Sequence, residues 1–248
     1  VIHSMGMPFD GNTIKTKSLG GSETAAYYQA RELARRGHRV SVFSNCAEMM
    51  DDEDGVRYVP VGQLTQAAPM GDAFEMYATH TPIDVLIVQR HPLAFHKRFN
   101  ARINIWQLHD LALLRSLGAV HHMLHSVTAV TVVSEWHKKQ VCEVYSLDPA
   151  RVFVVPNGVD PELYESDVAM TFAPVVARMG LEHLTNVFKD HYVMLYQSRP
   201  ERGLDHLVRP GGIMDRLRDE PKAHLLYCGY DNTTEQMRPY YAQLQAWA

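Results

Sequence analysis

Apolar and polar residues occur in blocks along the chain, and these blocks predict strands and helices in turn. Short runs of Val, Ile and Leu without a polar side are typical of parallel strands buried between two layers of helices. The predicted strands are 1–4, 39–44, 56–61, 84–89, 103–108, 128–134, 151–156, 192–197 and 223–229. The predicted helices are 23–36, 111–125, 135–145, 204–218 and 235–247. The repeated strand–helix units predict an α/β fold with a doubly wound, Rossmann-like parallel sheet.

The helix predicted over 23–36 has signals at both of its ends. Ala26, Ala30 and Leu33 fall on one face at helical spacing, which gives this helix an apolar side. Serine is a residue type that caps helix N-termini, and glycine is typical of the position just beyond a C-terminus. We therefore expect Ser22 to be the N-cap and Gly37 to end the helix.

The pattern changes near Asn157-Gly158 and Asp160-Pro161, which are residue pairs typical of turns. A polar, weakly periodic stretch follows before strand–helix units begin again. We expect an N-terminal Rossmann-like domain over 1–160, a linker or insertion over 161–190, and the beginning of a second Rossmann-like domain over 191–248. A doubly wound domain usually has more than two strands, so we expect the rest of this second domain to be missing. The chain also opens on the end of a strand, which suggests a clipped N-terminus.

Composition excludes several classes of protein. With 24 basic and 28 acidic residues the formal net charge is −4, whereas nucleic-acid binders usually have a basic excess. We expect no signal peptide, and no stretch approaches the roughly 20 apolar residues of a membrane span. The three cysteines are far apart, which favours a reducing compartment over a disulfide framework. The cytoplasm is the expected location.

A peripheral position at the inner membrane face is the alternative location. Basic residues in two loops favour an anionic surface, while the overall charge opposes strong attraction to one. These basic residues are Lys15, Lys17, Arg90, Lys97 and Arg98.

The sequence Gly20-Gly21-Ser22-Glu23 joins the first loop to the first predicted helix. Paired glycines let the backbone approach a ligand closely, and a helix N-terminus offers free N–H groups to an anion such as phosphate. A tight loop with an ordinary serine cap is the alternative interpretation.

His109-Asp110 directly follows the strand predicted over 103–108. Ligands of open α/β sheets bind at the carboxyl ends of the strands, where His109 is placed to hydrogen-bond a sugar hydroxyl. The alternative is that His109 packs in the core and Asp110 caps the next helix.

Arg199 and Arg202 lie in a turn between a predicted strand and a predicted helix. Two arginines at such a turn can clamp a diphosphate and offset the charge that builds up on a leaving group. The alternative is a solvated pair that Glu201 partly neutralises.

Two further clusters suggest metal ligands, and for both we favour a simpler explanation. His121 and His125 are one helical turn apart with His122 between them, but no third zinc ligand accompanies them. The acidic run Asp51–Asp54 lacks the spacing of a calcium loop. A solvated helix face and a polar loop are the expected structures, and no metal site is predicted.

Five runs occur in an order and at spacings that resemble glycosyltransferase family 4. They are SLGGSET over 18–24, ARELARRGHRV over 30–40, VVSEWH over 132–137, VVPNGVD over 154–160 and SRPERGL over 198–204. The resemblance covers nearly the whole chain except 163–191. It implies a GT-B architecture of two Rossmann-like domains and transfer of a sugar, with retained anomeric configuration, from a nucleotide-diphosphate sugar. It also implies that no cofactor or bound metal is needed.

The resemblance implies roles for individual residues. Gly20 and Gly21 match the family's glycine loop near the donor phosphates, and His109 matches a histidine that contacts the donor sugar. Arg199 and Arg202 match the basic pair that grips the diphosphate, although the family usually has lysine at the second position. Neighbouring motif positions add two further candidates for the donor site, Asp110 and Ser134.

One expected feature of the family is absent from its usual place. The second domain of the family carries two glutamates separated by seven residues. Glu135 and Glu143 have this spacing but lie in the predicted first domain, so we interpret the match as coincidence. The true pair is expected beyond residue 248.

A retaining glycosyltransferase that moves a sugar to an acceptor hydroxyl is the leading functional hypothesis. A non-catalytic nucleotide-sugar or partner-binding module is one alternative, and a GT-B nucleotide-sugar epimerase is another. The expected partners are a nucleotide-sugar donor and a glycan, lipid-linked or small-molecule acceptor, with polysaccharide biosynthesis as the setting and no nucleic acid. The acceptor loops are predicted at Asn12–Lys17 and Arg90–Phe99.

Overall fold

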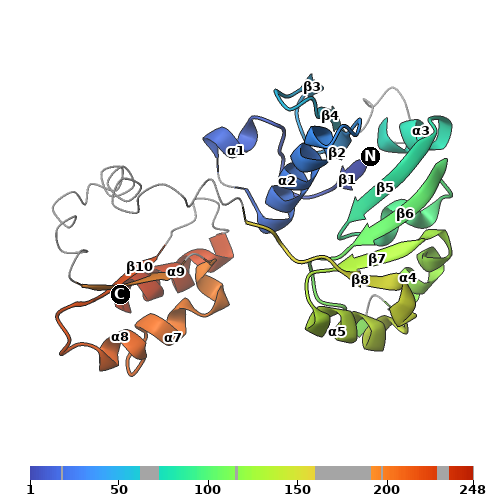
Figure 1. The fold of residues 1–248 in the computed structure, drawn as a ribbon. Helices are drawn as coiled ribbons and strands as arrows, with labels where there is room; N and C mark the ends of the chain where they lie inside the picture. Colours follow the sequence, from blue (N-terminus) through green and yellow to red (C-terminus); the bar gives the residue numbers. More distant parts are fainter. Residues whose placement is uncertain are drawn as a thin grey trace. The chain divides into compact units, whose positions relative to one another are not determined.

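The computed structural model describes residues 1–17, 19–61, 73–114, 117–159, 191–196, 198–227 and 235–247. The chain divides into two compact units, Val1–Gly158 and Val159–Ala248, which we call unit 1 and unit 2 (Figure 1). The linker expected over 161–190 lies outside the described residues.

Unit 1 is built around one sheet with the strand order β3-β4-β2-β1-β5-β6-β7-β8. The strands are β1 (Ile2–Ser4), β2 (Ser41–Ser44), β3 (Met50–Asp51), β4 (Arg57–Pro60), β5 (Ile83–Gln89), β6 (Ala101–Gln107), β7 (Ala129–Val132) and β8 (Val152–Val154). Neighbouring strands pair in parallel, apart from β3, which pairs with β4 in the antiparallel direction. The strand order reverses between β1 and β5, as expected for a doubly wound sheet.

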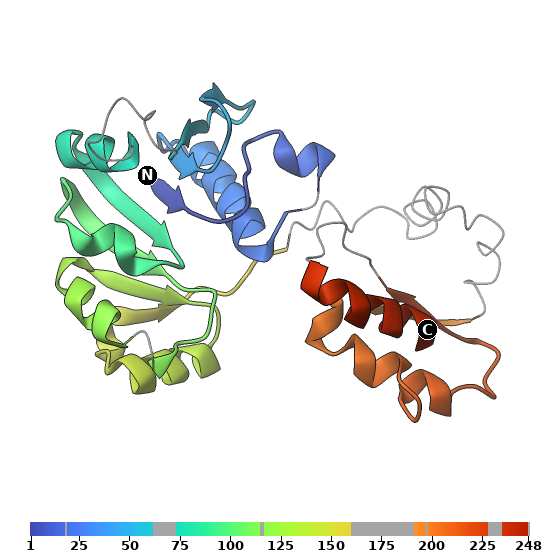
Figure 2. The ribbon, with the colours of Figure 1, turned by 180° about the vertical axis from the view of Figure 1, so that it is seen from behind.

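Helices cover both faces of this sheet, and Figure 2 shows the sheet from behind. They are α1 (Thr13–Thr16), α2 (Gly21–Arg35), α3 (Ala73–His80), α4 (Leu117–Met123) and α5 (Glu135–Tyr145), with 3-10 turns at Pro92–His96, Leu124–Ser126 and Pro149–Arg151. On one face, Ile2 and Val42 pack against Ala26 of α2. On the other face, Phe43 and Trp106 belong to a core that includes residues of α3, α4 and α5. Burial on both faces explains the continuous apolar strands.

The ends of α2 confirm one expectation and correct another. Gly37 adopts a φ of 88°, and its N–H donates to the Ala34 carbonyl while the His38 N–H donates to the Leu33 carbonyl, so Gly37 ends the helix as expected. The expectation of a Ser22 N-cap is wrong, because α2 begins at Gly21 with Gly20 as its N-cap. The Ser22 hydroxyl instead donates to the Glu23 carboxylate.

The start of the helix predicted over 111–125 is wrong. Residues 111–113 are not helical, and α4 begins at Leu117. Side chains of α5 bind the backbone of this segment, which is therefore not part of α4. Gln140 accepts from the Ala112 N–H and donates to the Ala112 carbonyl, and the Tyr145 hydroxyl accepts from the Leu113 N–H. These tertiary hydrogen bonds satisfy the backbone groups that a helix would otherwise satisfy.

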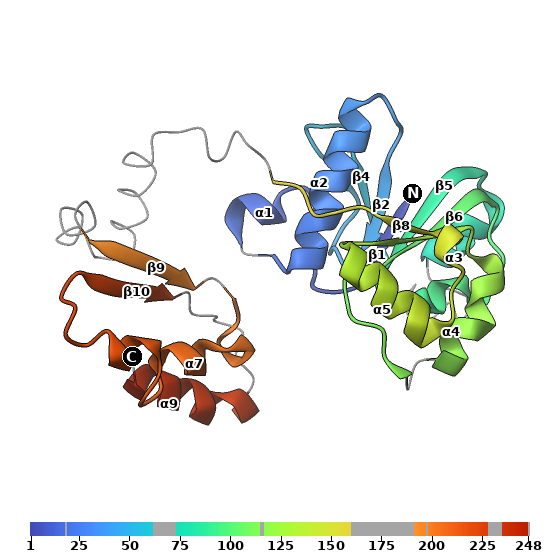
Figure 3. The same ribbon diagram turned by 60° about the horizontal axis from the view of Figure 1, so that its bottom comes forward.

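The described part of unit 2 contains two parallel strands, β9 (Tyr192–Tyr196) and β10 (Ala223–Tyr227). Its helices are α7 (Leu204–Val208), α8 (Ile213–Arg216) and α9 (Arg238–Trp247), with 3-10 turns at Pro200–Arg202 and Glu235–Met237. Figure 3 shows α7 and α9 on the same face of the two strands. The buried side chains of Leu204, Val208 and Leu244 form the core between them.

The single helix predicted over 204–218 is wrong, because the structure breaks it between α7 and α8. Pro210 cannot continue a helix without loss of a backbone hydrogen bond. Gly211 adopts a φ of 75°, and a Cβ on Gly212 would lie 2.7 Å from the Arg209 carbonyl oxygen. Both glycines are therefore required at this turn.

Candidate functional site

The candidate site of unit 1 lies where β1, β5 and β6 end. Because these strands are parallel, the residues that follow them meet at one edge of the sheet. The edge includes the point between β1 and β5 at which the strand order reverses, which is where ligands bind in open α/β sheets. The residues found there are Met5–Met7 after β1, Arg90 after β5, Leu108–Asp110 after β6 and the start of α2.

Glu23 occupies the middle of the glycine loops at this edge. Its side chain is only 3% exposed, and its carboxylate accepts the Met7 N–H at 3.1 Å and the Ser22 hydroxyl at 3.0 Å. A Cβ on Gly6 would lie 2.0 Å from Glu23 Oε1, and a Cβ on Gly20 would lie 2.3 Å from Oε2. Gly6 and Gly20 are thus needed for contact with this carboxylate.

Sequence reasoning singled out Gly20 and Gly21 but missed Glu23 and Gly6. The available signal was a glutamate at the third position of the helix, where an acidic side chain complements the helix dipole and reaches back to free N–H groups. For Gly21 the packing gives no such reason, because an added Cβ meets nothing within 4 Å in the described part of the chain.

Arg90 and Asp110 form a bidentate ion pair across the ends of β5 and β6. Arg90 Nε lies 2.6 Å from Asp110 Oδ2, and Nη2 lies 3.3 Å from Oδ1. This hydrogen-bonded pairing raises the pKa of Arg90. The Arg90 backbone has a φ of 62°, which is strained for an arginine, and the Trp106 indole N–H holds its carbonyl at 3.0 Å. Asp110 therefore pairs with Arg90, and its predicted role as a helix cap is wrong.

His109 lies half-buried beside this ion pair. Burial lowers the pKa of His109, and the Asp110 carboxylate partly opposes that effect. The imidazole is therefore neutral near pH 7. Its Nε2 atom is buried without a hydrogen-bond partner among the described residues. A neutral imidazole can either donate to or accept from a hydroxyl group, depending on its tautomer.

The start of α5 holds the segment that contains His109 and Asp110. The Ser134 hydroxyl is the N-cap of α5 and accepts from the His137 N–H at 3.1 Å. The buried imidazole of His137 lies 3.0 Å from the Asp110 carbonyl oxygen through Nε2. Ser134 thus lies near the other candidates through His137, a residue that sequence reasoning missed.

A polar pair lies beneath this edge, inside the sheet. The Ser4 hydroxyl donates to Gln89 Oε1 at 2.8 Å, where β1 and β5 end. Gln89 is buried, and its Nε2 atom has no hydrogen-bond partner among the residues described. Buried polar side chains are unusual in a strand, so this pair marks the same end of β1 and β5 as a place suited to a polar ligand.

Arg199 precedes the 3-10 turn that follows β9 in unit 2, and Arg202 is the last residue of that turn. The Tyr196 hydroxyl donates to the Arg199 carbonyl at 2.9 Å, and Arg199 Nε lies 3.6 Å from Glu201 Oε1. The Tyr241 hydroxyl lowers the pKa of Glu201 by donating to its carboxylate. Both arginine side chains are exposed, which leaves their guanidinium groups available to an anion.

The clusters that suggested metal ligands are occupied by other contacts. His121 Nε2 lies 2.8 Å from the Tyr145 carbonyl oxygen, and His125 Nδ1 lies 2.7 Å from the His122 carbonyl oxygen. Over the described ranges, no three His, Cys, Asp or Glu side chains gather as a metal site would require. Glu135 and Glu143 lie exposed on α5 in unit 1, where Glu143 pairs with Lys139 at 3.8 Å.

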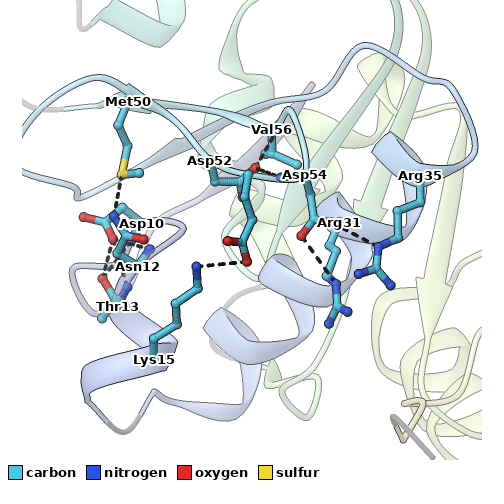
Figure 4. Close-up of polar contacts among 11 residues, drawn as sticks. Asp10, Asn12, Thr13, Lys15, Arg31, Arg35, Met50, Asp52, Asp54 and Val56 are labelled. Carbon is cyan, nitrogen blue, oxygen red and sulfur yellow. Dashed lines mark hydrogen bonds and ion pairs between the residues drawn. The ribbon is translucent and has the colours of Figure 1, made fainter. Parts of the chain in front are cut away.

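The acidic run 51–54 is a set of structural contacts, and Figure 4 shows those of Asp52 and Asp54. Asp51 belongs to β3, which the prediction of a loop missed, and Asp52 accepts the N–H groups of Asp54 and Val56. Asp54 lies 3.5 Å from Arg31 and 3.0 Å from Arg35 of α2. The run therefore ties the β3–β4 turn to α2.

The basic residues of the two predicted acceptor loops are partly neutralised. Lys15 pairs with Glu53 at 3.0 Å, and Lys97 pairs with Glu75. Together with the Arg90–Asp110 pair, these contacts reduce the charge that the loops would offer to an anionic surface. Within the described ranges, no helix is long and apolar enough to span a membrane.

Comparison with known proteins identifies relatives of the chain. A sequence profile for Glycosyltransferase Family 4 matches residues 19–163, which is more than half of the chain. The chain is 22% identical over 211 residues to a phosphatidylinositol N-acetylglucosaminyltransferase subunit of Arabidopsis thaliana, covering 74% of this chain and 46% of that protein. It is 23% identical over 245 residues to D-inositol 3-phosphate glycosyltransferase of Kineococcus radiotolerans, covering 83% and 54%. The chain spans about half the length of these curated relatives.

Solved structures show the same fold. HepE of Anabaena, solved in complex with UDP-glucose, has a TM-score of 0.62 at 16% identity and covers 99% of this chain and 65% of its own. The UDP-forming α,α-trehalose-phosphate synthase of Burkholderia vietnamiensis has a TM-score of 0.60 at 10% identity, with coverage of 99% and 67%. At such identities the likeness concerns the fold alone, and it confirms the expected α/β fold of GT-B type.

Proposed function

This chain belongs to glycosyltransferase family 4, and we propose that it is part of a retaining glycosyltransferase that moves a sugar from a nucleotide-diphosphate sugar to an acceptor hydroxyl. The observation that carries this proposal is the neutral, half-buried His109 beside the Arg90–Asp110 pair, at the edge where the strand order reverses. A neutral hydrogen-bonding group at this edge suits a sugar hydroxyl better than it suits a phosphate.

In the proposed reaction, residues of each unit have a role. Arg199 and Arg202 bind the diphosphate and stabilise the charge that builds up as the sugar–phosphate bond breaks. His109 orients the donor sugar. The acceptor oxygen bonds to the anomeric carbon on the face that the diphosphate leaves, and a leaving phosphate oxygen takes the acceptor proton. No protein base is therefore required in this scheme.

The relatives guide the choice of substrates for a test. HepE was solved with UDP-glucose and with UDP and glucose, which supports a uridine nucleotide as the first donor to try. The names of both curated relatives refer to inositol. An inositol phosphate is therefore the first acceptor to include beside simple sugars.

The proposal is tested by calorimetric titration of the chain with UDP, GDP and ADP. We expect one nucleotide to bind and the Arg199→Ala, Arg202→Ala double variant to bind it about 100-fold more weakly, since two charge-assisted contacts are lost. The matched control is Arg209→Ala with Arg218→Ala, which removes the same charge from unit 2. Its affinity is expected to stay within about threefold of the parent, in line with loss of long-range attraction only.

Two results would contradict the proposal. The first is a nucleotide affinity that the double variant leaves unchanged. The second is the absence of binding to any nucleotide by a chain that unfolds cooperatively. Where a nucleotide does bind, its sugar conjugates are incubated with an inositol phosphate and the anomeric configuration of the product is read by NMR. Inverted configuration would refute the retaining mechanism, and epimerised donor without an acceptor would indicate an epimerase.

A further inference from the structure

Glu23 places a buried negative charge at the centre of the unit 1 edge. A carboxylate removed from water costs several kcal/mol unless other groups compensate its charge, so a buried ionised group needs partners. The Met7 N–H and the Ser22 hydroxyl supply two hydrogen bonds, and the first turn of α2 supplies the positive end of its dipole. The carboxylate is thus compensated by groups from two separate segments of the chain.

Two glycines leave room for this carboxylate. The positions that a Cβ on Gly6 and on Gly20 would occupy lie 2.0 Å and 2.3 Å from the two carboxylate oxygens. The loop after β1 and the N-terminus of α2 therefore both approach Glu23 with bare backbone. The contact fixes the distance between these two segments.

The same carboxylate acts on the neighbouring charged groups. The Cβ position of Gly6 also lies 3.9 Å from Arg90 Nη1, so the Arg90 guanidinium and the Glu23 carboxylate both lie near Gly6. The pKa of Arg90 is raised mainly by its hydrogen bond to Asp110, and that of His109 is lowered mainly by burial; on both groups the charge of Glu23 has a smaller effect that raises the pKa. Besides Glu23, the charged or titratable groups that face His109 are Asp110, Arg90 and His137.

We propose that Glu23 is a positioning residue that joins the loop after β1 to the start of α2 and adds its charge to the electrostatic environment of Arg90 and His109. In this arrangement the Glu23 carboxylate lies at the start of α2, with the Met7 N–H and the Ser22 hydroxyl as donors. Gly20 leaves the space in which the Glu23 carboxylate lies. The consequence for sugar transfer rests on the proposed function, whereas the joining role does not.

The test compares Glu23→Gln with Glu32→Gln, a matched substitution at an exposed position of the same helix. Glutamine keeps the volume of the side chain and removes its charge. We expect amide hydrogen exchange at Met7 to become about fivefold to tenfold faster in Glu23→Gln, because a hydrogen bond to a neutral acceptor is weaker than one to a carboxylate. Glu32→Gln is expected to leave this rate unchanged.

The second readout is the pH titration of the His109 imidazole by NMR, assigned with a His109→Gln variant. Loss of the Glu23 charge in Glu23→Gln is expected to lower the pKa of His109. If Glu23 only filled space, the same substitution would leave that pKa unchanged. Equal Met7 exchange and equal His109 titration in the Glu23→Gln and Glu32→Gln variants would overturn the proposal.

Two further variants keep the test decisive if Glu23→Gln does not fold. Gly20→Ala pushes a Cβ against the carboxylate without removing it, and is expected to speed Met7 exchange as well. In a Glu23→Ser background, where the space next to Gly20 is free, Gly20→Ala is expected to lower the melting temperature by less than it does in the parent protein. Unchanged Met7 exchange in Gly20→Ala, or additive effects in the double variant, would refute the role of Glu23.

These measurements require no nucleotide, so they separate this proposal from the proposed function. A chain that fails to bind any nucleoside diphosphate but shows the expected coupling of Glu23 to Met7 and His109 refutes sugar transfer and keeps the positioning role. A chain that binds a nucleotide but shows no such coupling refutes the positioning role of Glu23 and leaves the proposed function standing.

Discussion

In unit 1 the candidate residues hold one another in place, whereas in unit 2 the two arginines are held mainly by the turn that carries them. Arg90 is fixed by Asp110 through its side chain and by Trp106 through its carbonyl. Arg199 has a backbone contact from Tyr196 and a longer approach to Glu201, and its side chain is about half exposed, at 49%. Unit 1 is thus organised before any ligand arrives, while the arginines of unit 2 lose side-chain freedom when they bind one.

The largest effect is expected from removing the core beneath the unit 1 edge. Trp106 is 1% exposed, and its ring stacks on Tyr145 at 5.9 Å between centroids. Trp106→Ala is expected to lower the free energy of unfolding of unit 1 by about 3–5 kcal/mol, through the cavity and the lost contact to the Arg90 carbonyl. Urea unfolding with hydrogen exchange resolved by unit measures this loss.

Trp136→Ala is the matched control, because Trp136 is 64% exposed on α5. Its cost is expected to stay within about 0.5 kcal/mol. If Trp106→Ala leaves the exchange of the Arg90 amide unchanged, the edge of unit 1 does not depend on the core, and the contrast with unit 2 fails.

The sequence predicted the fold well where structure is set locally. Continuous apolar runs indicated the parallel strands, and Glu135–Tyr145 was predicted with the same bounds as α5. One prediction failed because contacts distant in sequence decide the structure. The backbone of residues 111–113 is captured by Gln140 and Tyr145, and no local pattern near Leu111 reports these partners.

The candidate site was predictable only in part, for the same physical reason. The order of strands and loops placed His109 and Asp110 at the carboxyl end of β6, so their location followed from the sequence. The pairing of Asp110 with Arg90 required the register between β5 and β6, which residue spacing does not contain. Glu23 was overlooked because its burial depends on the two glycines that face it, Gly6 and Gly20.

The second largest effect is a loss of unit 1 stability in acid. Burial, with a smaller contribution from His91, lowers the pKa of His3 to about 4 from its ordinary 6.5. Between these values the unfolded chain binds a proton that the folded chain does not, so stability is complete above pH 6.5 and falls as the pH drops toward 4. The loss from this one group is expected to reach about 3 kcal/mol.

A His3→Phe variant tests this acid sensitivity, because phenylalanine keeps a ring against Phe74 and cannot titrate. Denaturant unfolding at pH 7 and pH 4.5 is compared for the parent, for His3→Phe and for the exposed control His38→Gln. His3→Phe is expected to lose less stability on acidification than either of the others. Equal losses in all three proteins would show that His3 does not set the acid limit of unit 1.

A smaller effect separates the glycines of the two units. Gly203 adopts a φ of 114°, so Gly203→Ala is expected to destabilise unit 2 by about 1–2 kcal/mol. Gly21 lies in the first turn of α2 with open space around it, and Gly21→Ala is expected to stabilise unit 1 by up to about 1 kcal/mol. Thermal unfolding of both variants checks these signs. If Gly21→Ala is destabilised, the fold needs a glycine at position 21 as well as at position 203. The expected difference between these two glycines would then be absent.

The smallest effect is expected for Asp110→Asn, which tests how far unit 1 depends on its visible ion pair. The Asp110 side chain is 56% exposed, and exposed pairs contribute less than about 1 kcal/mol to stability. The control Asp84→Asn removes a carboxylate from an exposed pair with Arg102 on the same sheet. Both variants are expected to unfold at nearly the parent temperature. Only Asp110→Asn is expected to lower the pKa of His109, because the Asp110 charge raises it in the parent. If NMR titration finds the pKa of His109 unchanged in Asp110→Asn, burial and Glu23 set its protonation, and the ion pair serves to hold Arg90 rather than to tune the histidine.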